Sequence, residues 1–242
     1  TTQDAPLVAP ALVKSSADNM VYLLRSAQRR LTISGADRLK FGLANTVIET
    51  VPPSAYDQIA LGEPVIAPGA FVKANNAPAS YLIDGFNRAL LVSTEAQAKT
   101  LGLTKPRALK PEYLKGYNKK VAIETSKVLC QDQLFMAVGG KLSGISVADA
   151  AHYPGTVLSL DALTCATLKK NLAADDRLNQ IGRFIRTPDR QLWLVQRGKK
   201  RLIANAAAYQ LLVGDRVPLV AVDAYFGSLI PVGAKAPATL VE

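Results

Sequence analysis

The sequence predicts a β-rich α+β repeat protein made of four strand-strand-strand-helix units. The first observation is a set of four 13-residue segments that align without a gap and begin at Tyr22, Tyr81, Leu134 and Trp193. The second is that a short strand precedes each segment and a helix-like stretch follows it, and the segments begin 53 to 59 residues apart. Several features that recur in one order at nearly constant spacing are the signature of a repeat architecture.

The assembly of the units follows from their size. A unit of about 55 residues with short strands cannot bury both faces of its strands alone, so it must pack on its neighbours. We therefore expect a single domain with units 1 to 4 at about 11–68, 69–126, 127–180 and 181–237. A closed, propeller-like ring is the favoured arrangement because closure removes exposed strand edges, and an open stack is the alternative.

The strands of each unit are predicted from their apolar residues. The first strand is short and ends in a polar or basic residue at Lys14, Lys73 and Arg186, with 128–131 as its counterpart in unit 3. The second strand opens with three consecutive apolar residues, which suggests burial on both faces. A turn follows, and the third strand carries one basic residue at the same position in every unit: Arg29, Arg88, Lys141 and Lys200.

The helices are predicted from capping residues. Each aligned segment ends in a residue that caps helices well, namely Ser34, Ser93, Ser146 and Asn205. Gly42, Gly102 and Gly214 are placed to end the helices that follow. A second, short helix opens at a proline or aspartate in each unit, at Pro53, Pro111, Asp161 and Asp223.

The two ends of the chain read differently from the units. The polar residues 1–10 and the tail 232–242 are expected to be loosely structured. Because the sequence starts without Met or an apolar leader, we expect a processed mature protein or a fragment.

Residues of the second unit carry a family resemblance. Val72-Lys73, then Tyr81-Leu82-Ile83-Asp84-Gly85, then a basic residue and a serine that opens a helix, resemble tandem repeats of secreted bacterial proteins. Those repeats are associated with the cell wall and often lie next to peptidoglycan hydrolase domains. The match is best over 71–102 and 183–214, looser over 22–42 and degenerate over 134–155. The resemblance implies an extracytoplasmic binding role, secreted or at the cell surface, and supplies neither a ligand nor binding residues.

The charge balance suggests an anionic partner. The 29 Lys and Arg residues outnumber the 19 Asp and Glu residues, so the net charge is +10. In a ring, the recurring basic residues would form a band of charge that attracts a polyanion. The predicted polyanion or glycan site comprises Arg29, Arg88, Lys141, Lys200, Arg30, Arg201, Lys14, Lys73 and Arg186. The same side chains could instead keep strands soluble and protect their edges.

Cysteine and histidine usage bounds the chemistry. Cys130 and Cys165 are the only possible disulfide pair, and two buried free thiols are the alternative. The single histidine, His152, is expected to be a helix-terminal packing residue, and helix capping explains Asp161 and Asp223. We therefore predict no catalytic residues, no metal and no cofactor.

The functional prediction is a non-catalytic extracellular module that binds cell-envelope glycan or another anionic surface polymer. A cell-wall hydrolase or a fragment of one is an alternative, and a protein-binding adhesion or structural module is another. Nucleic acid is the natural competitor for a basic protein, but no long basic helix or RNA-binding aromatic strand pattern is present. The sequence leaves the oligomeric state open.

Overall fold

A computed structural model of the 242-residue chain describes residues 11–17, 19–25, 27–32, 35–41, 43, 45–171, 181–213 and 219–237. The predicted capping residue Ser34 and the predicted helix ends Gly42 and Gly214 lie outside these ranges. The same holds for residues 1–10 and the last part of the tail.

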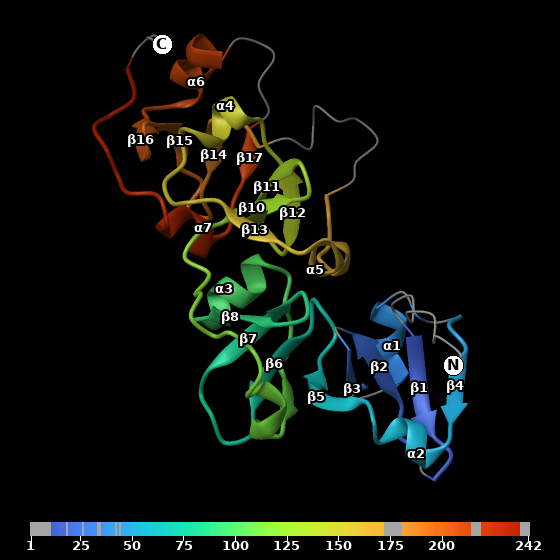
Figure 1. The fold of residues 1–242 in the computed structure, drawn as a ribbon. Coiled ribbons are helices and arrows are strands. Elements are labelled where there is room, and N and C mark those ends of the chain that lie inside the picture. The colour runs from blue at the N-terminus through green and yellow to red at the C-terminus, as the bar shows by residue number, and fades with distance from the viewer. Residues whose placement is uncertain are drawn as a thin grey trace.

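Each unit contains one small sheet, and the four sheets share a strand order (Figure 1). Three antiparallel strands follow one another, and a fourth strand pairs in parallel with the first. Unit 1 holds β1 (Ala11–Ser15), β2 (Tyr22–Arg25), β3 (Gln28–Thr32) and β4 (Ile48–Val51). Unit 2 holds β6 (Phe71–Ala74), β7 (Ser80–Asp84), β8 (Arg88–Val92) and β9 (Arg107–Leu109). Unit 3 holds β10 (Lys127–Cys130), β11 (Gln133–Val138), β12 (Lys141–Gly144) and β13 (Leu158–Leu160). Unit 4 holds β14 (Phe184–Arg186), β15 (Leu192–Gln196), β16 (Lys199–Ile203) and β17 (Val220–Ala221).

Two helices flank the fourth strand of each sheet. The one before it is α1 (Gly35–Lys40), α3 (Glu95–Thr100), α4 (Val147–Ala150) or α6 (Ala206–Val213). The one after it is α2 (Pro53–Tyr56), the 3-10 helix η1 (Pro111–Leu114), α5 (Ala162–Thr167) or α7 (Ala224–Ser228). The fourth strands are absent from the sequence prediction, because two to four residues are too few to show an alternation of apolar and polar side chains.

The caps agree with the prediction except at α3. Ser146, Asn205, Asp161 and Asp223 each accept a hydrogen bond from a backbone N–H group in the first turn. The cap of α3 is Thr94 rather than Ser93, since the Thr94 hydroxyl accepts from Gln97 N at 3.1 Å. The Gln97 side chain in turn accepts from Ser93 N at 2.7 Å. Gln97 therefore bonds back to the start of its helix, as in a capping box.

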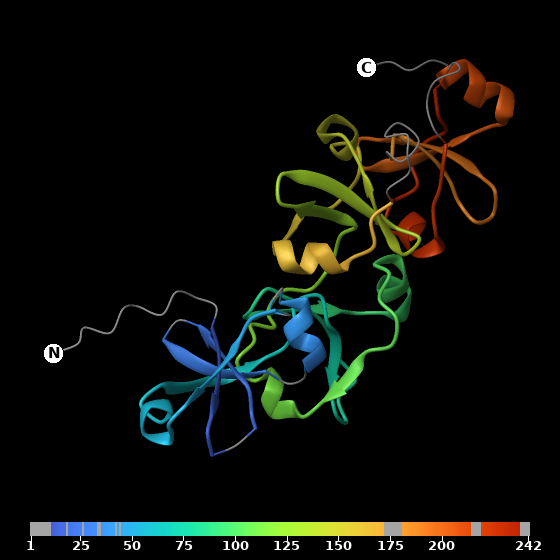
Figure 2. The same ribbon diagram turned by 90° about the vertical axis from the view of Figure 1, so that its right-hand side faces the viewer.

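The predicted closed ring is wrong. The sheets of units 1 and 4 lie at opposite ends of the molecule and do not meet (Figure 2). The physical reason lies at the third strand of each sheet, whose outer edge pairs with a later segment of the same unit. β5 (Ala60–Val65) pairs with β3, and single bridges join Asn118 to β8, Lys170 to β12 and Val232 to β16. Closure is not needed to cover these edges.

The pairing at Val232 also corrects the expectation for the tail. Gly233 N donates to Lys200 O at 2.8 Å, and Ala236 N donates to Leu202 O at 3.0 Å. The first residues of the tail are thus part of the fold of unit 4.

Shared hydrophobic cores hold neighbouring units together. Leu82 and Leu90 of unit 2 pack with Val128 and Phe135 of unit 3. Met136 and Val138 of unit 3 pack with Ile185, Trp193 and Phe226 of unit 4 in the same way. A smaller cluster joins Leu23, Phe41 and Val65 of unit 1 to the partly buried Phe86 of unit 2.

Cys130 and Cys165 form a disulfide between β10 and α5, with their Cα atoms 5.7 Å apart. Both residues are buried in the core shared by units 2 and 3. The structure thus decides between the two alternatives that the sequence left open. Disulfides of this kind are typical of oxidising, extracytoplasmic compartments.

Candidate anion-binding surface

The four recurring basic residues lie on the third strands, and three of them bond to their own chain. The Arg29 guanidinium lies 3.9 Å from the centre of the Tyr56 ring and 3.7 Å from Asp57 Oδ1. Arg88 donates to the Asp84 carboxylate and to Ser159 O, and Lys200 Nζ donates to Gly227 O at 2.6 Å. Lys141 is exposed on β12. Each of the four thus lies on a different sheet, and three of them already use their charge or their donors within the protein.

The remaining predicted site residues are spread over several sheets. Arg30 donates from Nε to Glu63 O at 2.8 Å and from its terminal nitrogens to Phe86 O at 3.3 Å. The Arg201 side chain is half-buried, and its Nε has no hydrogen-bond partner among the described residues. Lys14 and Lys73 are half-buried and Arg186 is exposed, each on the first strand of a different sheet.

The hairpin turns that precede these basic residues are joints with the unit before. Gly140 N donates to Thr100 O at the end of α3, at 3.1 Å. Gly198 N donates to His152 O just after α4, at 2.9 Å. In the first pair of units, the Phe86 ring stacks on Phe41 with ring centres 5.6 Å apart. A hairpin turn on the helix end of the preceding unit is thus a recurring contact.

The same turns also contact the short helix of the unit after. Asp84 Oδ1 accepts from Asp161 N at 2.8 Å, and Gly85 N donates to Thr164 Oγ1 at 3.2 Å. Gly139 N donates to Asp223 Oδ2 at 2.8 Å. Each of these two turns therefore links elements of three successive units.

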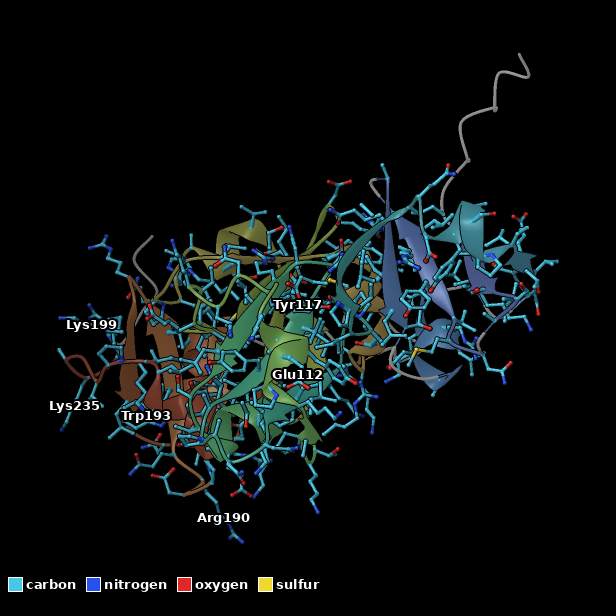
Figure 3. All side chains as sticks on the ribbon, turned by 60° about the horizontal axis from the view of Figure 1, so that its bottom comes forward. Glu112, Tyr117, Arg190, Trp193, Lys199 and Lys235 are labelled. Atoms are coloured by element: carbon cyan, nitrogen blue, oxygen red, sulfur yellow. A yellow bond between two sulfur atoms is a disulfide. The ribbon has the colours of Figure 1, made fainter. Side chains whose placement is uncertain are left out.

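The excess positive charge belongs mainly to two units. Unit 2 has nine Lys and Arg against four Asp and Glu, and unit 4 has nine against three. Units 1 and 3 are nearly neutral, with six against five and five against five. Figure 3 shows Arg190, Lys199 and Lys235 of unit 4 at the end of the molecule farthest from unit 1.

Unit 2 carries its excess in one stretch, which we call the lysine-rich segment. Its members are all exposed: Lys99, Lys105, Lys110, Lys115, Lys119 and Lys120. Only Lys99 forms an ion pair among the described residues, to Glu95 at 2.8 Å. The predicted site does not include this segment, because the prediction rests on charges at repeated positions. A count of lysines along the chain would reveal it.

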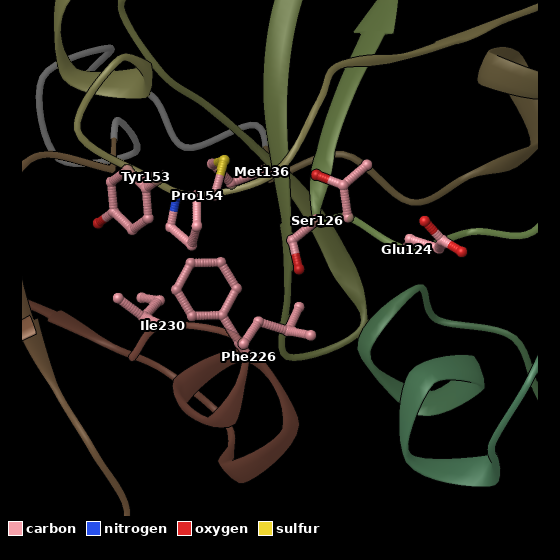
Figure 4. Close-up of a pocket in the computed structure, with 10 residues that line it drawn as sticks. Glu124, Ser126, Met136, Tyr153, Pro154, Phe226 and Ile230 are labelled. Carbon is pink, nitrogen blue, oxygen red and sulfur yellow. The ribbon is translucent and has the colours of Figure 1, made fainter. Parts of the chain in front are cut away.

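A small pocket between units 3 and 4 does not suit a ligand (Figure 4). Its volume is about 60 Å³, and Tyr153, Met136 and Phe226 line it. Tyr153 donates its hydroxyl to Gly182 O at 2.8 Å, and burial raises its pKa. Lys127 Nζ donates to Tyr153 O at 3.0 Å, and burial lowers the pKa of this ammonium. These polar groups fix the contact between the two units.

The groups with potential for chemistry have structural roles. Asp161 and Asp223 cap helices, as predicted. Burial and the nearby cations Arg183 and Arg197 lower the pKa of His152 against the opposing effect of Asp149. Among the described residues there is no group of three His, Cys, Asp or Glu side chains that could hold a metal ion. Within the same ranges, no helix is long and apolar enough to cross a bilayer.

Comparisons with known proteins give no family. No family model matches the chain, and no curated protein matches it. Among solved structures, a chain of the periplasmic assembly from the ESX-5 inner membrane complex aligns at 9% identity and a TM-score of 0.23. This alignment covers 98% of our chain and 94% of that one. A chain of the intact ESX-5 inner membrane complex aligns at 12% identity and a TM-score of 0.21, over 93% of our chain and 57% of that one. TM-scores this low do not establish a shared fold.

Proposed function

We propose that the protein is a non-catalytic binding module, secreted or at the cell surface, that holds an anionic polymer of the bacterial envelope through the lysine-rich segment of unit 2. The observation that carries the proposal is the exposure of all six lysines, five of which have no ion-pair partner among the described residues. Exposed lysines along one stretch of chain create a positive field that attracts a polyanion and is screened by salt.

The arrangement of the other cations supports this choice of surface. Arg29, Arg88 and Lys200 bond to groups of their own chain. A ligand that used them would have to replace these contacts. Within the lysine-rich segment, the exposed ion pair of Lys99 with Glu95 is the one ion pair among the described residues that a ligand would have to replace.

Retention on purified bacterial cell walls tests the proposal. The test variant replaces Lys110, Lys115, Lys119 and Lys120 by Gln, and the control replaces the exposed Lys40, Lys141, Lys169 and Lys235. Both variants lose four positive charges, so only the position of the loss differs. We expect about a tenfold loss of retention at low salt in the first variant and less than about twofold in the control. Equal losses in both, or no retention of the native chain at low salt, would contradict the proposal.

A protein-binding module is the second candidate, and unit 1 favours it. Four of its apolar side chains are more than half exposed: Met20 at 52%, Leu39 at 62%, Leu61 at 65% and Val47 at 77%. A protein partner that buried these side chains would gain hydrophobic stabilisation. Retention that is lost at high salt but persists on trypsin-treated walls would exclude this candidate. A clear band in zymography would show a hydrolase instead.

A further inference from the structure

A groove lies where units 1, 2 and 3 meet. Its volume is about 560 Å³, within the range of small-ligand sites. The end of β2, the β7–β8 turn and the start of α5 supply its walls, which are mostly polar. Three arginines reach it, namely Arg25, Arg30 and Arg88. We propose that this groove binds a phosphate or carboxylate group and that Arg25 is the residue that holds it.

Arg25 differs from the other two arginines because its donors are free. Its guanidinium carbon lies 3.5 Å from the centre of the Phe86 ring, and the residue is exposed. Among the described residues it makes no hydrogen bond and no ion pair. Stacking on an aromatic ring leaves the N–H groups, which lie in the guanidinium plane, directed outward. That fork matches the oxygens of a carboxylate or phosphate.

The Phe86 ring on which Arg25 stacks is held in place by contacts within the protein. Phe86 stacks on Phe41 of unit 1 at an interplanar angle of 13°. Its carbonyl oxygen accepts from both terminal nitrogens of Arg30. A side chain that rests on a fixed ring loses less freedom when a ligand binds, which favours affinity.

The remaining charges of the groove also favour an anion. Arg30 and Arg88 use their donors within the protein but keep their positive charge. Asp84 uses both carboxylate oxygens, on Asp161 N and Arg88, and Asp161 Oδ1 accepts from Leu163 N. Three cations thus stand against two carboxylates whose oxygens are largely used.

The arginine at this position is found in unit 1 and is not repeated in the other units. In the aligned segments, the position of Arg25 is occupied by Asp84, Ala137 and Gln196 in units 2 to 4. The stacked guanidinium at the end of the second strand is therefore a feature of the first joint. The inference deepens the proposed function, because it rests on that function for the source of the anion: a phosphate or a carboxylate of the polymer.

The test is a titration followed by NMR of the arginine Nε–H groups in the full chain, which has 13 arginines. The probes are inorganic phosphate and acetate, with sodium chloride at matched ionic strength as reference. We expect a saturable shift of the Arg25 signal with at least one probe and none with chloride. In Arg25→Gln, saturable binding should weaken at least about tenfold, and in Phe86→Leu about threefold or more. Arg190→Gln removes an exposed arginine of unit 4 and should bind as the native chain does.

The outcomes separate this inference from the proposed function. Saturation by phosphate alone identifies a phosphate polymer, and saturation by acetate alone identifies an acidic glycan or peptide. The groove proposal would be wrong if the Arg25→Gln variant bound phosphate and acetate as well as the Arg190→Gln variant does and its melting temperature were unchanged. If the native chain saturates with phosphate but is not retained on cell walls, the groove stands and the proposed function fails. If the native chain is retained on cell walls but saturates with neither probe, the groove proposal fails and the proposed function stands.

Discussion

Two joints of the molecule use a carboxylate for the same task but supply it from opposite sides. Between units 2 and 3, Asp84 at the hairpin turn accepts from Asp161 N at the start of α5. Between units 3 and 4, the acid is the helix cap Asp223, and the turn supplies the backbone donor Gly139 N. The contact therefore depends on a carboxylate between turn and helix, and not on the position that carries it.

The two carboxylates differ in what else they hold. Asp84 is 3% exposed and pairs with Arg88, which also reaches Ser159 O on β13. Asp223 has no cation partner among the described residues and bonds to three neutral donors: Thr100 Oγ1, Phe226 N and Gly139 N. A buried charge that loses its partner costs more than a lost neutral hydrogen bond. The joint between units 2 and 3 should thus be the more sensitive of the two.

Of the two joints, the larger effect is therefore expected at Asp84. Asp84→Ala leaves the partly exposed Arg88 without its acid and Asp161 N without an acceptor, and should lower the free energy of unfolding by about 3 kcal/mol. Asp223→Ala removes a helix cap and two hydrogen bonds, and should cost about 2 kcal/mol. Urea unfolding of both variants measures the difference. Equal losses would show that the ion pair adds nothing to the joint.

The disulfide gives the next effect, and it lies within unit 3, in the core that this unit shares with unit 2. It closes a loop with a sequence separation of 35 residues. In the chain-entropy model such a cross-link contributes about 3–4 kcal/mol. We expect the Cys130→Ala, Cys165→Ala double variant to lose that amount in urea unfolding, and the native chain to lose it in reductant. A double variant whose melting temperature equals that of the oxidised native chain would contradict this.

Gly102 and Gly139 offer a smaller and sharper test of the same contact. Both have positive φ, +75° and +58°, so alanine strains the backbone at either site. A Cβ on Gly102 would lie 2.4 Å from Gly140 O, whereas one on Gly139 would meet nothing within 4 Å. Gly102→Ala should therefore cost about 3 kcal/mol and Gly139→Ala about 1 kcal/mol. Similar losses in the free energy of unfolding of the two variants would show that the close contact between Gly102 and Gly140 does not limit the side chain at position 102.

Local patterns predicted the elements of each unit well, and the contacts between units poorly. The apolar triplets, the Asp161 and Asp223 caps and the proline starts at Pro53 and Pro111 depend on neighbours in the sequence, so the sequence shows them. The pairing of Val232 with β16 depends on residues some 30 positions apart, and no periodicity reveals it. The closed ring was inferred from the need to cover exposed strand edges. In the structure, later segments of each unit already cover these edges.

The predicted basic site stays a prediction, and its residues show what an alignment leaves out. A column of cations looks like a binding surface in an alignment, but Arg88 and Lys200 find acceptors only when the next elements fold against them. Arg25 stood outside the column and was not singled out, because the Phe86 ring that supports it lies in another unit.

The smallest expected effect is a pH dependence at the joint between units 3 and 4. Burial and the cations Arg183 and Arg197 lower the pKa of His152, so the folded chain binds the proton less readily than the unfolded chain. The unfolded chain then holds more protons below its ordinary pKa of 6.5, and stability falls as pH drops through that value. His152→Asn should flatten this slope, while the Gly198 N bond to the backbone carbonyl at position 152 remains. Urea midpoints of native and variant chains between pH 5 and pH 8, the range in which an ordinary histidine titrates, measure it. Parallel curves for the two chains would assign the acid sensitivity to another group.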